Sequence, residues 1–466
     1  MAAKGLAGHW SRDKQFEYLR RVFYKCNWME LHGISSDGPI VIDLENFFVP
    51  LSAPAPLREG ESKEEKERTL ASWRMVTPVR RKKTGGKAHT TGKEGSEART
   101  VQKLLSRHPR LVVSGPPGAG KSTTIAYISS VLARGIGRDD NELLSSRLGL
   151  RANPPFPLPI SLVDIHRWVR SREGRSKVTT RLVAPLSNAL RERFGECAPD
   201  AQALDALCRS GRVLLLLDGF DEIDDELARD VLLTAIGDLA IVYPWCSILF
   251  ATRSSVFDWP VERLMRRGFS ATMVFPFDSP DIREFTLRWI AAIYAGAVKL
   301  NENNGDLLSG IRHYDTIEIN KERRDVLRGL NGRAHGFYRA LTFHHVIGEM
   351  IGSPLVATAA CGILYNVELL PQKAEKIMAT LTDALLKLRP CFGHESCTEP
   401  EFYDKPLLGT LRKLAHFYQG KSEAPYVTEP MRLYLQKLGF LVPTDEELDC
   451  FRHESLEKYF SNLGEL

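Results

Sequence analysis

The segment Gly115-Pro-Pro-Gly-Ala-Gly-Lys-Ser122 has the G-x-x-x-x-G-K-[ST] spacing of a phosphate-binding loop. Glycines in such a loop let backbone N–H groups turn towards phosphates, and the following helix adds partial positive charge at its N-terminus. Lys121 is expected to reach the β- and γ-phosphates, and the Ser122 hydroxyl to ligate Mg²⁺. The segment predicts a nucleoside triphosphate site made by Gly115, Pro116, Pro117, Gly118, Ala119, Gly120, Lys121, Ser122 and Thr123.

An acidic segment follows about a hundred residues later, Leu214-Leu-Leu-Leu-Asp-Gly-Phe-Asp-Glu222. It places carboxylates after an apolar strand, where the magnesium side of such a site lies, so Asp218 is the expected Mg²⁺-coordinating residue. Asp221 and Glu222 come within one short turn, and either could polarise the attacking water. The acidic residues at positions 224–226 are expected only to cap the next helix.

A third motif, Ala251-Thr-Arg253, ends a further apolar strand. Its guanidinium is expected beside the γ-phosphate, where it could sense or stabilise developing negative charge. No N-K-x-D motif for guanine appears in the sequence, so adenine is the expected base. Together the motifs predict binding of ATP or ADP with Mg²⁺, with Lys121, Asp218, Asp221, Glu222 and Arg253 as candidate catalytic residues.

The elements that must position these residues alternate between apolar strands and helical segments from Arg110 onward. This alternation is typical of an α/β fold with a parallel sheet. Five strands are predicted, which complete a P-loop NTPase sheet: 111–114, 158–163, 213–217, 247–251 and 271–275. Before them, residues 38–45 alternate like an edge strand.

After Phe277 the sequence becomes helical. Ser279 is the expected N-cap of the first helix, with Pro280 at its first position. Residues 300–335 are polar and predict a loop or insertion, followed by apolar helices near 341–364 and 371–388. A helix over 429–438 and a hairpin then suggest a winged-helix unit. The expected domains are an N-terminal region (1–100), the NTPase domain (101–277), a helical domain (278–370) and a winged-helix domain (371–466).

Composition excludes several classes of protein. The longest apolar runs fall far short of the roughly 20 residues that cross a bilayer, and the N-terminus lacks a signal-peptide h-region, so we expect a cytoplasmic protein without a membrane partner. The basic segment 80–83 lies in a polar tract read as a loop; a nucleic-acid patch is the alternative, but few aromatic residues accompany it. Cys391, His394 and Cys397 lack a nearby fourth ligand, so structural zinc is not expected.

Taken together, the motifs resemble the NACHT family of STAND NTPases, which includes Nod-like receptors and bacterial anti-phage NACHT proteins. The acidic motif is similar to the family's Walker B form, and Ala-Thr-Arg253 to its sensor 1. The segment Gly352-Ser-Pro354 resembles a helical-domain motif whose proline packs near the base. Phe451-Arg-His453 looks like the winged-helix motif whose histidine contacts the β-phosphate of ADP.

The resemblance implies a nucleotide-controlled switch with slow, regulatory ATP hydrolysis. ADP would hold the helical and winged-helix units closed through Pro354 and His453, and ATP would release them for self-oligomerisation. It also implies innate immune or anti-phage defence, with an unidentified trigger ligand that could be phage-derived. No leucine-rich, TPR or WD repeat is visible, and residues 1–100 show no nuclease, protease or TIR chemistry, so trigger and effector stay unassigned.

Three other classes remain open. An AAA-type mechanical ATPase would need a trans-acting arginine finger and steady turnover. A small-molecule or polynucleotide kinase would share the phosphate loop but would leave the helical tail without a role. An interaction scaffold could hold nucleotide for structural reasons alone, in which case Asp218→Ala would leave its function intact.

Overall fold

The computed structural model describes a large part of the chain, and two compact units can be distinguished within it. The first unit comprises Met1–Asn27, Pro50–Gly115 and Lys121–Phe275, and the second comprises Trp28–Val49, Pro116–Gly120 and Pro276–Leu466. Each unit is considered by itself. The described residues are 10–35, 38–58, 99–150, 153–170, 182–223, 225–253, 259–294, 307–313, 321–367, 369–392, 405–418, 425–427, 435, 441–442 and 450–451.

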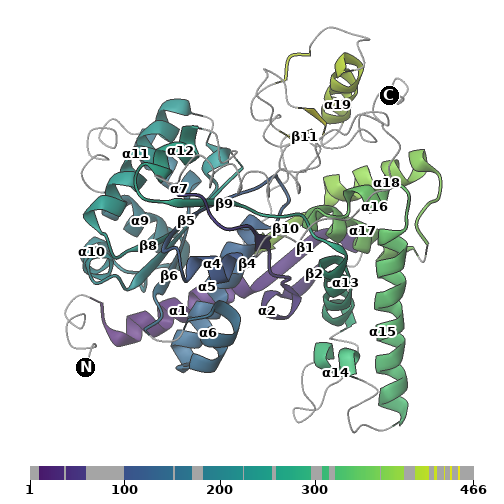
Figure 1. The fold of residues 1–466 in the computed structure, drawn as a ribbon, viewed down its shortest axis with the longest axis horizontal. Helices are drawn as coiled ribbons and strands as arrows, with labels where there is room; N and C mark the ends of the chain where they lie inside the picture. The colour runs from purple at the N-terminus through teal and green to yellow at the C-terminus, as the bar shows by residue number, and fades with distance from the viewer. Residues whose placement is uncertain are drawn as a thin grey trace. The chain divides into compact units, whose positions relative to one another are not determined.

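A five-stranded sheet forms the centre of the first unit, and all its neighbouring strands run parallel (Figure 1). The strand order is β6-β7-β8-β5-β9. This confirms the predicted α/β fold and all five strands, whose ends shift by no more than two residues. The strands are β5 (Arg110–Ser114), β6 (Phe156–Ser161), β7 (Val213–Asp218), β8 (Ser247–Thr252) and β9 (Ser270–Met273).

The sequence of β7 explains why it is an interior strand of the sheet. Val213 and the four leucines that follow are all buried, and the first polar residue is Asp218. A strand that is apolar on both sides is stable only where helices cover both faces of a parallel sheet. The carboxylate of Asp218 is therefore delivered at the carboxyl end of the strand.

Helices surround this sheet, and α5 is the one that follows the phosphate loop. Helices α1 and α6 pack against α5, whereas α11 packs against α7 and α12. The side chain of Asp225 accepts a hydrogen bond from the Ala228 amide at the start of α11, so the predicted capping role of Asp225 is confirmed. The helices of this unit are α1 (Arg12–Asn27), α4 (Val101–Leu105), α5 (Lys121–Arg138), α6 (Asn141–Leu148), α7 (Leu162–Arg170), α9 (Val183–Phe194), α10 (Ala201–Arg209), η1 (Phe220–Glu222), α11 (Glu226–Val242) and α12 (Trp259–Met265).

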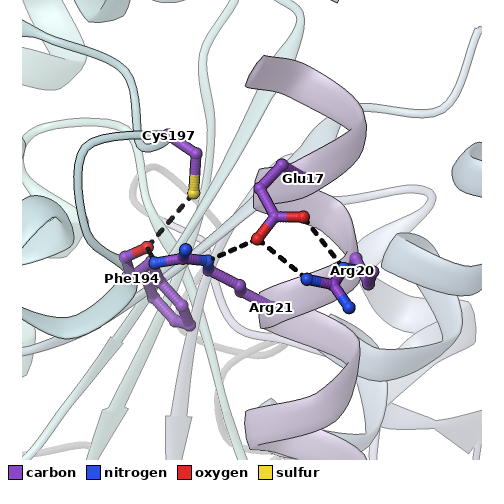
Figure 2. Close-up of polar contacts among 5 residues, drawn as sticks. All are labelled: Glu17, Arg20, Arg21, Phe194 and Cys197. Carbon is purple, nitrogen blue, oxygen red and sulfur yellow. Dashed lines mark hydrogen bonds and ion pairs between the residues drawn. The ribbon is translucent and has the colours of Figure 1, made fainter. Parts of the chain in front are cut away.

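Helix α1 is held to the rest of the first unit by an arginine that caps another helix (Figure 2). The guanidinium of Arg21 donates to the carbonyl of Phe194, the last residue of α9, at 2.9 Å. Glu17 orients this arginine through an ion pair of 2.7 Å and also pairs with Arg20 at 2.8 Å. These two arginines lower the pKa of Glu17 to about 2. The N-terminal helix is thus an integral part of the unit.

A chain segment that precedes the phosphate loop extends the edge of the sheet beside β9. The amide of Phe275 donates to Ser52, and Leu57 exchanges backbone hydrogen bonds with Ala271. Within this segment, β3 (Ser52–Ala53) pairs with β4 (Arg99–Thr100).

The second unit contains a three-stranded antiparallel sheet, β10-β1-β2, together with helices. The predicted edge strand is present as β2. Phe47 packs its ring against Phe285 and Trp289, which joins the strand region to α13. The elements are β1 (Trp28–Ser35), β2 (Gly38–Asp43), α2 (Leu44–Phe47), α13 (Ser279–Tyr294), α14 (Leu307–His313), α15 (Lys321–Thr342), α16 (Ile347–Met350), α17 (Pro354–Asn366), α18 (Ala374–Lys387), β10 (Arg389–Phe392), α19 (Lys405–Tyr418), β11 (Leu441–Val442) and β12 (Cys450–Phe451).

Residues 300–335 were predicted as a loop or insertion, and a loop is wrong for 307–313 and 321–335, where the structure contains α14 and the long helix α15. The apolar residues of α15 are few but recur at helical spacing, and Leu327, Leu330 and Ala334 are buried. This narrow stripe packs against α13 and α14, which lie beside α15 in Figure 1. Packing against neighbours outweighs the polar composition and the glycines of the segment.

The predicted N-cap at Ser279 is also wrong, by one residue. Helix α13 begins at Ser279, and the cap is Asp278, whose carboxylate accepts from the Asp281 amide at 2.9 Å. Asp281 in turn accepts from the Asp278 amide at 3.2 Å, so the two carboxylates form a reciprocal capping box.

The winged-helix unit stays a prediction. Helix α19 and the antiparallel pair β11–β12 are described in this region. His394, Cys397, His453 and the basic segment 80–83 lie outside the described residues. So does the predicted helix 429–438, except for Leu435, which is helical and buried. The predicted domain boundaries at 100, 277 and 370 also stay predictions.

Candidate functional site

The predicted phosphate loop joins β5 to α5, the strand and helix that the motif requires. Gly118 has a φ of 70° and Gly120 a φ of 88°, in the left-handed region that glycine adopts without strain. Lys121 is the first residue of α5, and its ammonium donates to the carbonyl of Gly115, the first residue of the loop. The lysine side chain thus lies along the loop that it is expected to serve.

Ser122 and Asp218 form the contact between the loop motif and the acidic motif. The Ser122 hydroxyl hydrogen-bonds the carboxyl of Asp218, which also accepts from the Gly219 amide. Asp218 keeps partial solvent exposure. The protein that surrounds it raises the pKa of its carboxyl, while the two hydrogen bonds and nearby Lys121 oppose that shift. A cation at this carboxylate would remove the cost of desolvating its charge.

These two side chains fit a Mg²⁺ site. Magnesium commonly uses one or two protein oxygens and completes its shell with water and phosphate oxygens. A hydroxyl and a carboxylate are hard oxygen ligands of that kind. The described residues contain no cluster of three or more His, Cys, Asp or Glu side chains that could hold a metal, so a protein-only metal cage is not shown there.

The structure also brings Arg253 close to η1, the acidic turn that contains Asp221 and Glu222. Its Nη2 lies 3.6 Å from Oε1 of Glu222, and its side chain is 13% exposed. The Nη1 group of Arg253 is buried and has no hydrogen-bond partner among the described residues. Because an orphaned buried donor is costly, this guanidinium fits a position that receives an anionic oxygen. Asp221, in the same turn, accepts hydrogen bonds from the end of β8.

In the second unit, the middle of the phosphate loop contacts the segment that contains Pro354. Pro354 is the first residue of α17, and Ser353 is its N-cap. The amide of Leu355 donates to the Gly118 carbonyl at 3.2 Å, and the Ser353 hydroxyl donates to the same oxygen at 3.4 Å. A carbonyl of the loop thereby satisfies an N-terminal amide of α17 that has no partner within the helix.

The sequence motifs did not single out two residues of this arrangement, Thr252 and Ser353. Thr252 is fully buried between the apolar strand and Arg253. The motif Ala251-Thr-Arg253 did contain a signal for Thr252: a hydroxyl at the end of an apolar strand is buried and needs a hydrogen-bond partner. Ser353 precedes a proline at a helix start, which is typical of an N-cap, but its hydroxyl bonds the loop instead.

Searches of protein-family models and of curated proteins find no match for this chain. The resemblance to the NACHT family therefore stays a prediction based on the motifs. Among the described helices, none combines the length and the apolar composition that crossing a bilayer requires.

Proposed function

We propose that this chain is a Mg²⁺-dependent, ATP-binding NTPase that acts as a nucleotide-controlled switch. The observation that carries the proposal is the hydrogen bond between Ser122 and Asp218. Two motifs that are distant in sequence and expected to share one Mg²⁺ ion are in contact at the carboxyl edge of a parallel sheet. That edge is where ligands of open α/β sheets bind.

Phosphate binding is assigned to the loop and the first turn of α5. Backbone amides of the loop after Pro117 and of the first turn of α5 would face the phosphates, and Lys121 would exchange the Gly115 carbonyl for phosphate oxygens. Ser122 and Asp218 would hold Mg²⁺, which neutralises charge on the β- and γ-phosphates when bound. Partial exposure of Asp218 supports access of the ion from solvent.

Hydrolysis would use the acidic turn and Arg253. In this step a water oxygen bonds to the γ-phosphorus, the bond to the β–γ bridging oxygen breaks, and ADP leaves. Glu222 accepts the proton of the water, which then passes to the departing phosphate. Arg253, with one donor unpaired among the described residues, would stabilise charge on the γ-phosphoryl oxygens.

The switch would depend on different contacts in the ADP and ATP states, because equal affinity for both conformations shifts nothing. The hydrogen bonds from Ser353 and Leu355 to Gly118 support this proposal, since they tie the loop conformation to the start of α17. Pro354 and His453 are the proposed contacts of an ADP-bound closed state. Self-oligomerisation of a cytoplasmic protein in antiviral defence, on recognition of an unidentified trigger, completes the proposal and rests on the family resemblance.

Isothermal titration calorimetry with Mg-ATP and Mg-ADP tests the binding site. Lys121→Ala should weaken both nucleotides about 10- to 100-fold, because it removes a charged hydrogen bond. Lys103→Ala is the matched control, since Lys103 is an exposed lysine of α4. Unchanged affinity in Lys121→Ala would refute the assignment of the loop.

Light scattering coupled to gel filtration tests the switch. Protein saturated with a non-hydrolysable ATP analogue should form larger assemblies than protein saturated with ADP. His453→Ala should weaken ADP more than the analogue and shift the ADP sample towards larger assemblies. Identical size distributions with both nucleotides, in both proteins, would leave binding intact and contradict the switch.

A further inference from the structure

Asp221 and Glu222 are adjacent in the turn η1, yet their carboxylates make different contacts. Asp221 uses both of its oxygens on the end of β8. Oδ1 accepts from the Thr252 hydroxyl at 2.9 Å, and Oδ2 accepts from the Arg253 amide at 2.7 Å. Gly219, with a φ of 78°, provides the left-handed residue that turns the chain after β7 towards β8.

Thr252 extends this connection to the phosphate loop. Its side chain is fully buried and donates to Asp221, while its carbonyl accepts from the Gly115 amide at 3.2 Å. The acidic turn, the end of β8 and the first residue of the loop therefore meet in one hydrogen-bonded junction. We call the contacts among Asp221, Thr252, Arg253 and Gly115 the strand-end junction.

Glu222 is placed differently. Its side chain is 40% exposed, and its Oε1 lies 3.6 Å from Nη2 of Arg253, an ion pair longer than a hydrogen bond. A partly exposed carboxylate can accept a proton from water. Asp221, whose two oxygens already accept from Thr252 and Arg253, would have to break the strand-end junction to do so.

From these contacts we propose that Asp221 is a positioning residue and that Glu222 alone activates the water. Asp221 acts through Thr252 and Arg253: it fixes the backbone from which the Arg253 guanidinium extends and the carbonyl that orients Gly115. This inference rests on the proposed ATP hydrolysis and assigns separate roles to its two adjacent carboxylates.

The two substitutions of Asp221 separate these roles. In Asp221→Asn, the amide oxygen can accept from the Arg253 amide. The amide NH₂ can donate to the Thr252 hydroxyl, since a hydroxyl both donates and accepts. The junction is kept, but a carboxylate base is lost. Asp221→Ala removes the junction and the carboxylate together.

Single-turnover hydrolysis of Mg-ATP gives the first test. Asp221→Asn should retain hydrolysis to within about tenfold of wild type. Asp221→Ala should lose about 100-fold, because misplaced catalytic groups cost that much. Glu222→Gln should lose about 100-fold or more, the contribution of a general base. If Asp221→Asn is as inactive as Asp221→Ala while Glu222→Gln hydrolyses ATP, the assignment is overturned.

Thr252 provides a second pair of variants in case Asp221→Ala fails to fold. Thr252→Val replaces the hydroxyl with a methyl group of similar size, and it should slow hydrolysis at least about tenfold. Thr252→Ser keeps the hydroxyl and removes the methyl group, and it should hydrolyse ATP at most of the wild-type rate. Equal rates for the valine and serine variants would show that the hydrogen bond to Asp221 does not matter.

Hydrogen exchange without nucleotide makes the test independent of ATP binding. Asp221→Ala should speed exchange of the Arg253 amide about tenfold or more, whereas Asp221→Asn should keep it protected. Asp225→Ala is the matched control: it removes the cap of α11 and should expose the Ala228 amide but not that of Arg253. If wild type binds no nucleotide in calorimetry, the proposed function fails. Unchanged Arg253 exchange in Asp221→Ala refutes the junction itself.

Discussion

The hydroxyl of Ser122, at the start of α5, hydrogen-bonds the carboxyl of Asp218, at the end of β7. The contact exists because the parallel sheet brings the carboxyl ends of β5 and β7 to one edge. Packed protein raises the pKa of Asp218, so the ionised carboxylate reduces the stability of the folded chain. A cation bound at the proposed Mg²⁺ site would therefore pair with a charge that folding alone disfavours.

Asp218→Asn should stabilise the nucleotide-free protein at neutral and higher pH. The folded pKa is raised, so the cost of ionisation is absent below the unfolded pKa and grows as pH rises through the folded value. The melting temperature of the variant should exceed that of wild type at pH 8, by about 2–4 °C for each kcal/mol, and the two should converge near pH 4.

Mg-ATP should reverse this order of stability. It should raise the melting temperature of wild type by mass action and leave Asp218→Asn almost unchanged. Scanning calorimetry at both pH values, with and without Mg-ATP, measures these shifts. A nucleotide-free variant that melts below wild type at pH 8 would contradict the account.

Glu222→Gln should separate binding from hydrolysis. Its affinity for Mg-ATP should stay within about threefold of wild type, while the single-turnover rate falls by two to four orders of magnitude. Glu262→Gln, which changes a partly exposed carboxylate on α12, is the matched control and should hydrolyse ATP normally. Loss of ATP affinity as large as the loss of rate would indicate a role in binding instead.

Gly118→Ala should disturb the phosphate loop. A Cβ at this position would lie 2.8 Å from Cβ of Leu355, and the φ of 70° disfavours any side chain. We expect a loss of about 1–2 kcal/mol in stability and weaker nucleotide binding. A Cβ at Gly137, in helix α5, would meet no described atom within 4 Å, so Gly137→Ala should be neutral or slightly stabilising. Thermal melts of both variants measure the change in stability, and calorimetric titration measures the change in nucleotide affinity.

Arg21→Ala should lower the free energy of unfolding of the first unit by about 1–2 kcal/mol, because it removes the cap of α9. Arg20→Ala removes an arginine that also pairs with Glu17 but is 76% exposed, and it should change stability by less than about 0.5 kcal/mol. Chemical denaturation of the two variants compares them directly. Equal losses would mean that the ion pair, and not the cap, matters.

The sheet and the phosphate loop could be predicted from sequence because their signals are local. Five apolar runs and one glycine pattern define them, and the strands that lead to Asp218 and Arg253 are predicted to within one residue. The roles of Asp221 and Glu222 could not be separated in this way. Their difference depends on Thr252 and Arg253, which reach the turn only when β7 and β8 pair.

Helix α15 was not predicted from the sequence, for a related reason. Its sequence is polar and contains glycines, and its apolar stripe becomes significant only when α13 lies beside it. The capping error at Ser279 arose because two neighbouring residues can both cap a helix. The reciprocal bonds of Asp278 and Asp281 decided between them.

The three glycines of α15 have a consequence for how the second unit comes apart. A Cβ at Gly329, Gly332 or Gly336 would meet no described atom within 4 Å, so packing does not require glycine at these positions. Each glycine costs the helix about 1 kcal/mol relative to alanine. Contacts with α13 and α14 must offset that cost. The backbone amides of α15 should therefore lose their protection from hydrogen exchange when those contacts break. Faster hydrogen exchange in α15 would then be an early sign that the second unit is unfolding.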